Sequence, residues 1–155
     1  MFYKYSKWLI GLNFIKTVVY FEIINEIISA IFPILAWLTN AGKVFEASNF
    51  ESLTKDIIVS IIIAPIIETL IAQYLPYIVL RFFTKNLYII YTISSIIFAL
   101  GHTYNTWYMV ATFFIGIIFI GLFAVLSKKS MAMAFWGVVI VHAISNTIAV
   151  IYGHI

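Results

Sequence analysis

The feature that most constrains this chain is the run at residues 57–80. Polar side chains interrupt its apolar and aromatic residues only at Ser60, Glu68, Thr69 and Gln73. A helix needs about 20 apolar residues to cross the roughly 30 Å hydrocarbon core of a bilayer, so this run is long enough. At about 1.5 Å per residue, Glu68 lies some 16 Å from the start of the run, close to mid-membrane. A charged carboxylate at that depth costs on the order of 2.5 kcal/mol or more, which makes Glu68 a candidate functional residue.

The composition assigns the whole chain to the membrane. Of 155 residues, 64% are hydrophobic and 10% are charged, and the mean hydropathy is +1.08. A soluble domain of this size exposes too much surface to hide so many apolar residues. The net charge of +3 comes from scattered basic residues and indicates membrane topology, not nucleic-acid binding. Because cysteine is absent, disulfides and thiolate chemistry are excluded.

The apolar segments predict an all-α fold, a polytopic membrane helix bundle with a four-helix catalytic core. We place five transmembrane spans, at residues 17–38, 57–80, 87–104, 107–126 and 131–152. Residues 1–56 then hold an N-terminal interfacial segment, the first span and a polar loop, and residues 57–155 form the core.

The basic residues predict the orientation of these spans. Most of them fall on one side of the membrane, and only Lys43 and Lys55 fall on the other. The positive-inside rule therefore predicts a cytoplasmic N-terminus. We expect an integral protein of a prokaryotic cell membrane.

Four polar side chains inside the spans could act together. Glu68 lies on the second span, His102 near the outer end of the third, and His142 and Asn146 on one face of the fifth. Counted along their helices, Glu68, His142 and Asn146 share a depth, and His102 lies within about one helical turn of it. One carboxylate, two imidazoles and an amide can activate a water molecule and stabilise an oxyanion.

Two prolines flank the glutamate. Pro65 and Pro76 lack an N–H group, which frees the carbonyls of Ile61 and Ala72 and loosens the helix. Membrane helices tolerate such breaks where neighbouring protein or a water-filled cavity satisfies the backbone. The sequence therefore favours a hydrated cavity beside Glu68.

Structural interpretations compete with the functional one. A single buried glutamate, histidine or asparagine can serve only to join two membrane helices by hydrogen bonds. Glu22 and Glu26 share a helical face with Asn25 near the start of the first span, where we expect an interfacial or structural role. Tyrosine and tryptophan near span ends, among them Tyr104 and Tyr108, are typical of the aromatic belt.

Several classes of membrane protease are disfavoured. His102 is followed by Thr103, so the chain lacks the His-Glu-x-x-His motif of zinc proteases. The only aspartate, Asp56, lies at a span boundary, which argues against an aspartyl protease with two intramembrane aspartates. No span contains a Gly-x-Ser-x-Gly serine elbow.

Three short segments together resemble a known family. They read Ala-Pro-Ile-Ile-Glu-Thr at 64–69, Phe-Ala-Leu-Gly-His at 98–102 and His-Ala-Ile-Ser-Asn at 142–146. In order and on successive helices, they resemble the Glu-Glu-x-x-x-Arg, Phe-x-x-x-His and His-x-x-x-Asn motifs of the CPBP family. This family, also called Abi, comprises CAAX prenyl endopeptidase-like and bacteriocin-processing intramembrane proteases.

The resemblance implies hydrolysis of a peptide bond within the membrane. Glu68 would be the general base that activates water, helped by His102, while His142 and Asn146 would stabilise the oxyanion. The implied partners are a peptide or protein substrate and the lipid bilayer. No cofactor is expected, and a zinc ion held by Glu68, His102 and His142 stays open by ligand type.

The first motif departs from the family pattern. Thr69 stands at the second glutamate and Gln73 at the arginine; with Phe98 of the second motif, these are the supporting residues. In the family pattern the two charges can pair on one helix face. Replacing both at once avoids an uncompensated buried charge and indicates a variant site.

Two further functions stay open at the sequence level. The neutral first motif favours a non-catalytic member that acts in bacteriocin immunity or as a scaffold. A small transporter with Glu68 as a proton carrier is a weaker alternative, because the chain shows no internal repeat.

Overall fold

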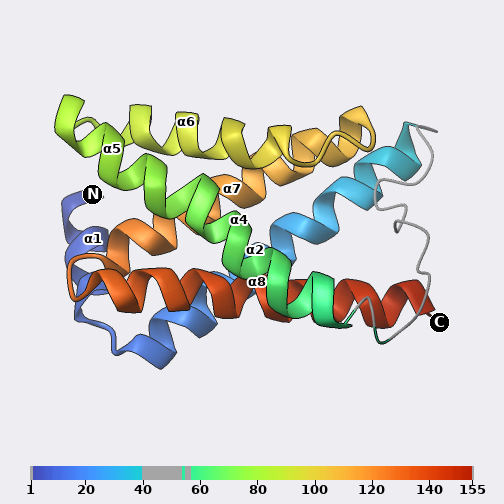
Figure 1. The fold of residues 1–155 in the computed structure, drawn as a ribbon, viewed down its shortest axis with the longest axis horizontal. Coiled ribbons are helices and arrows are strands. Elements are labelled where there is room, and N and C mark those ends of the chain that lie inside the picture. The colour runs from blue at the N-terminus through green and yellow to red at the C-terminus, as the bar shows by residue number, and fades with distance from the viewer. Residues whose placement is uncertain (1, 40–53, 55–56, 155) are drawn as a thin grey trace.

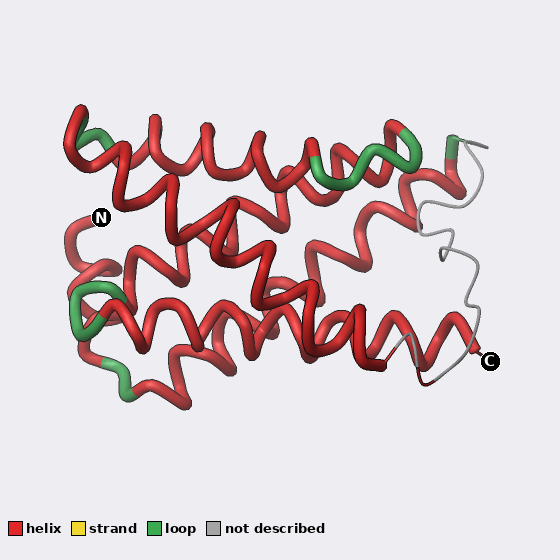
Figure 2. Tube along the Cα trace, viewed as in Figure 1, coloured by secondary structure: helices red, strands yellow, loops and turns green. Residues whose placement is uncertain are grey.

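The computed structural model describes residues 2–39, 54 and 57–154, with side chains from residue 7 to residue 151. Every regular element in these ranges is helical, which confirms the predicted all-α bundle (Figures 1 and 2). The predicted polar loop at residues 40–56 lies outside the described residues, apart from Thr54. The elements, in chain order, are α1 (Phe2–Gly11), α2 (Phe14–Leu38), η1 (Ile57–Ile63), α4 (Ala64–Thr69), η2 (Leu70–Tyr74), α5 (Leu75–Phe83), α6 (Leu87–Leu100), α7 (Thr106–Leu126) and α8 (Met131–His154).

Four helical stretches of the described chain are long and apolar enough to cross a membrane, which shows an integral membrane protein. They are α2, the continuous path from η1 to α5, α7, and α8 up to Ile151. The third predicted span differs, because α6 has 14 residues and ends at Leu100. At about 1.5 Å per residue it is roughly 21 Å long, short of the bilayer core. The helix ends early because the chain turns at Gly101, and the Asn105 side chain caps α7 by accepting from the Tyr108 N–H at 2.8 Å.

Helix α7 lies at the centre of the bundle and packs against α2, α6 and α8. Its sequence is apolar on all faces, as expected of a helix surrounded by others, and Phe119 and Phe123 are fully buried. Gly116 permits the close approach of α6, because a Cβ atom there would lie 3.0 Å from the Cα atom of Ser95. This rigid centre supports the helices that carry the candidate residues.

The second span is distorted where its prolines predict. The π-helical segments η1 and η2 lie directly ahead of the helices that contain Pro65 and Pro76. The Ser94 hydroxyl donates to the freed carbonyl of Ala72, which confirms that protein satisfies the backbone at this break. At the first break, the Asn146 amide donates to the carbonyl of Ser60 at 2.6 Å, one residue before the predicted position.

The same span crosses the bundle diagonally. In Figure 1 the path from η1 to α5 runs from the side of α8 to the start of α6. Accordingly, η1 and α4 pack against α8, whereas η2 and α5 pack against α6. Glu68, in α4, is thereby placed between the helices that carry the two candidate histidines.

Candidate active site

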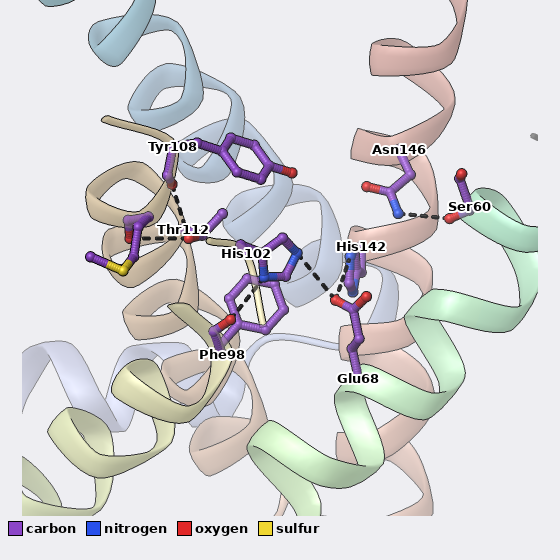
Figure 3. Close-up of polar contacts among 9 residues, drawn as sticks. Ser60, Glu68, Phe98, His102, Tyr108, Thr112, His142 and Asn146 are labelled. Atoms are coloured by element: carbon purple, nitrogen blue, oxygen red, sulfur yellow. Dashed lines mark hydrogen bonds and ion pairs between the residues drawn. The ribbon is translucent and has the colours of Figure 1, made fainter. Parts of the chain in front are cut away.

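One carboxylate oxygen faces both intramembrane histidines. Glu68 Oε2 lies 3.4 Å from Nε2 of His102 and 3.7 Å from Nε2 of His142 (Figure 3). The three side chains come from α4, from the turn after α6 and from α8. The helix packing therefore brings together three of the four candidate catalytic residues.

The ring of His102 is held by the end of α6. Its Nδ1 atom lies 2.8 Å from the carbonyl oxygen of Phe98, and the two rings are in contact at 4.6 Å between centroids. A carbonyl can only accept, so Nδ1 carries the hydrogen and donates it. In a neutral ring Nε2 then presents its lone pair to Glu68. A proton between Nε2 and the carboxylate would form a hydrogen bond between the two groups, so one proton can pass from Glu68 to His102.

The ring of His142 is packed among aromatic side chains. The ring lies between Phe98 and Phe119, at centroid distances of 5.6 and 5.0 Å, and His142 as a whole is buried. Among the described residues, its buried Nδ1 atom has no hydrogen-bond partner. The orientation of the ring is therefore set by packing, with Nε2 directed at the glutamate.

Access to the three groups is uneven. The Glu68 side chain is 33% exposed, whereas those of His102 and His142 are 12% and 5% exposed. The Oε2 atom of Glu68 is itself buried, so the exposed part of the side chain lies away from the imidazoles. The Glu68 side chain is therefore open on one side, while the histidines are shielded.

Asn146 is directed at a different partner. Its Nδ2 atom donates to the carbonyl of Ser60 in η1, and the side chain lies one turn from His142 along α8 (Figure 3). An amide NH₂ has two hydrogens, so one N–H remains for another acceptor. The structure thus shows Asn146 joining α8 to the distorted second span, beside the cluster around Glu68.

The supporting residues differ in their contacts. Phe98 touches both histidines and supplies the carbonyl that binds His102. Thr69 and Gln73 are fully buried, and no hydrogen bond to either polar side chain is formed within the described part of the chain. Thr69 and Gln73 therefore form no hydrogen bond that would take the place of the ion pair expected from the family pattern.

A metal ion was an open possibility at this site. Within residues 2–39, 54 and 57–154, no group of three or more His, Cys, Asp or Glu side chains is arranged to hold one. The expectation of no cofactor remains a prediction.

Tyr108 was missed by the sequence reasoning, which placed it in the aromatic belt. Its ring lies 5.5 Å from that of His102, edge to face, and Figure 3 shows its hydroxyl directed across His102 toward α8. The available signal was Asn105: an N-cap there starts a helix whose first turn lies next to His102.

The family model described as type II CAAX prenyl endopeptidase Rce1-like matches residues 50–148, more than half of the chain, and the match includes all four candidate catalytic residues. The chain belongs to this family. No curated protein and no solved structure matches the chain.

Membership in the Rce1-like family confirms the resemblance drawn from the three motifs. At the level of the family it supports a CAAX-protease-like intramembrane peptidase, embedded in a bilayer and acting on a peptide. A role in bacteriocin immunity, the prokaryotic origin and the orientation of the N-terminus stay predictions.

Proposed function

We propose that the protein hydrolyses a peptide bond in a membrane-bound peptide by means of a water molecule that Glu68 activates. The observation that carries this proposal is the convergence of two imidazole Nε2 atoms on Glu68 Oε2. Family membership supports peptide hydrolysis, and the partial exposure of Glu68 supports access for water and substrate.

In the proposed reaction, the Glu68 carboxylate removes a proton from water as the water oxygen attacks the peptide carbonyl carbon. The tetrahedral intermediate then collapses, the C–N bond breaks, and the proton passes to the departing amine. The products are a carboxylate and an amine, and no other reactant is needed. His102 can hold the proton between these steps, because its Nε2 lone pair faces the glutamate.

The oxyanion needs hydrogen-bond donors that are already in place. We assign this role to His142 and to the amide hydrogen of Asn146 that Ser60 does not use. Removing one donor of this kind lowers kcat by about 10²- to 10³-fold in other acyl-transfer enzymes.

Glu68→Gln tests the proposal. We expect it to lower kcat at least about 10³-fold, because the amide cannot accept the proton of water. The measurement is cleavage of membrane-anchored CAAX-type peptides, with and without a prenyl group, by the full chain in proteoliposomes, with products identified by mass spectrometry. The matched control is Glu22→Gln, the same chemical change on α2, for which we expect near wild-type turnover. Unchanged turnover in Glu68→Gln would overturn the mechanism.

Metal dependence is tested separately. We propose that no step requires a metal ion, so incubation with 1,10-phenanthroline should leave turnover unchanged. Loss of turnover that zinc restores would contradict this proposal.

One observation favours a second candidate, a non-catalytic role in bacteriocin immunity or as a scaffold. Thr69 and Gln73, where the family pattern carries two charges, are buried and unpartnered among the described residues. This candidate expects Glu68→Gln to preserve protection of cells against a bacteriocin, and it expects no cleavage by the wild type. Cleavage by the wild type that Glu68→Gln abolishes would exclude it.

A further inference from the structure

Helix α2 lies outside the matched family region, which begins at residue 50. It nevertheless carries a polar face within a long apolar helix, with Glu22, Asn25 and Glu26 spaced three and four residues apart. In the folded chain α2 packs against both α7 and α8. The polar face therefore requires an explanation that family membership does not supply.

A single hydroxyl on α8 joins two of these residues. The Asn25 amide donates to Ser145 Oγ at 2.6 Å, and Ser145 Oγ donates to Glu26 Oε1 at 2.9 Å. Asn25 is fully buried, so its hydrogen bond is shielded from competing partners. The acceptor carboxylate of Glu26 strengthens the second bond relative to a neutral one. Together the two bonds fix Ser145 against α2.

The position of Ser145 gives this contact its significance. It lies between His142 and Asn146 in the third motif, three residues after the first and directly before the second. A helix has about 3.6 residues per turn, so Ser145 is about 60° around the axis from His142. Holding Ser145 against α2 therefore also sets the direction in which His142 points.

A small rotation of α8 would disrupt the site. Side chains extend about 5–6 Å from a helix axis, so a rotation of ~20° would move the His142 ring by about 2 Å. The separation between His142 Nε2 and Glu68 Oε2 is 3.7 Å, and such a shift would change it by up to about half. Lipid offers little resistance to this rotation, because it is as apolar as the helix faces it touches.

We infer that Asn25, Glu26 and Ser145 are positioning residues, which fix the rotation of α8 so that His142 faces Glu68. Helix α2 then contributes to the geometry of the active site, in addition to spanning the membrane. The inference rests on the proposed function for its kinetic consequences, but the geometry it claims can be measured without turnover.

Ser145→Ala is the decisive variant, and Thr147→Val is its matched control. Thr147 is also a half-buried hydroxyl residue on α8, but its hydroxyl bonds within its own helix, to the Ala143 carbonyl at 2.7 Å. With the full chain in proteoliposomes, we expect Ser145→Ala to lower kcat about tenfold or more and to leave KM within about twofold. Thr147→Val should leave both constants near wild type.

Three further variants separate the positioning role from general destabilisation. Glu26→Gln keeps an acceptor for Ser145 and should retain about a third or more of wild-type kcat, whereas Glu26→Leu should match Ser145→Ala. The double variant Asn25→Ala/Ser145→Ala should be no slower than Ser145→Ala by more than about twofold, because both changes break one chain of bonds. Additive losses would overturn the inference.

A readout that needs no activity keeps the inference independent of the proposed function. His142 is 4% exposed, so diethyl pyrocarbonate should modify it slowly in the wild type. We expect its modification, followed by mass spectrometry of the His142 peptide, to accelerate at least about fivefold in Ser145→Ala and not in Thr147→Val. Equal rates in all three proteins would overturn the inference, even if Glu68→Gln had abolished cleavage. Faster modification of Ser145→Ala alone would support it, even if the wild type cleaved nothing.

Discussion

Two regions of this protein hold partly buried carboxylates, Glu68 and Glu26, and their surroundings differ. Around Glu68 the contacting groups are two imidazoles, each with its Nε2 atom directed at the carboxylate. Around Glu26 the contacting group is the Ser145 hydroxyl, itself bonded to the Asn25 amide, and neither group acts as a base. The first arrangement suits proton transfer, and the second suits a fixed join between helices.

The helices that carry these carboxylates differ in the same way. Glu68 lies in a span interrupted by two π-helical segments, while Glu26 lies in a continuous α-helix. The interruptions expose backbone carbonyls that Ser94 and Asn146 bind. In this fold the irregular backbone accompanies the proposed chemistry, as is common in membrane proteins, where such breaks must be satisfied by protein or water.

The largest effect on kcat should come from giving Glu68 surroundings like those of Glu26. The double variant His102→Gln/His142→Gln surrounds Glu68 with amides, which form hydrogen bonds but do not exchange protons at neutral pH. We expect kcat to fall at least about 10³-fold. The measurement is peptide cleavage in proteoliposomes, with gel filtration to compare the folded fraction. Turnover above about a tenth of wild type would show that the two regions do not differ in the way proposed.

A smaller loss is expected at the residue that joins α8 to the broken span. Asn146→Ala removes the bond to Ser60 and the second amide hydrogen, and we expect kcat to fall about 10²-fold. In Asn146→Asp, kcat should fall by a similar factor, because a carboxylate cannot donate a hydrogen bond to an oxyanion or to a carbonyl. If Asn146→Asp keeps wild-type kcat, the assigned role of Asn146 as a donor is wrong.

The proximity of Glu68 to His142 and the breaks in the second span were predictable from the sequence. Depth along the spans was enough to predict that Glu68 and His142 lie near each other, and the prolines predicted the breaks and the need for a partner at Ala72. Each of these predictions uses a property of one helix at a time, such as its length, its depth in the bilayer or its proline positions.

The remaining features depend on how helices are rotated against each other. The bond from Ser145 to α2 and that from Asn146 to Ser60 are examples, and apolar patterning could not predict them. Helix α7 is apolar on every face, and lipid-facing and buried residues are alike in membrane spans. The early end of α6 was missed for a local reason, since the turn that begins at Gly101 was read as part of a longer span.

Glu22 lies on the same helix as Glu26 but differs from it in hydrogen bonding, so the two carboxylates should affect stability differently. Both of its carboxylate oxygens are buried, and in the described part of the chain neither has a hydrogen-bond partner. Replacing an unsatisfied buried polar group by an apolar one is often stabilising, so we expect Glu22→Leu to raise the free energy of unfolding by about 1–3 kcal/mol. Thermal unfolding in detergent would measure it. Glu26→Leu should be destabilising instead, because it breaks the bond from Ser145; equal effects in the two variants would contradict this contrast.

The smallest effect on kcat is expected at Tyr108, an aromatic neighbour of His102 in the Glu68 region. The Tyr108 ring lies edge to face on His102, and its hydroxyl is directed across that ring toward α8 (Figure 3). Tyr108→Phe keeps the ring contact and removes only the hydroxyl, and we expect kcat to fall about three- to tenfold. Tyr108→Leu also removes the edge-to-face contact, worth about 0.5–1.5 kcal/mol, and should cost a further few-fold. The control is Tyr104→Phe, since the Tyr104 ring contacts Tyr108 and is itself exposed. If Tyr108→Phe and Tyr104→Phe both retain full kcat, Tyr108 supports His102 through packing alone and its hydroxyl has no part in the reaction.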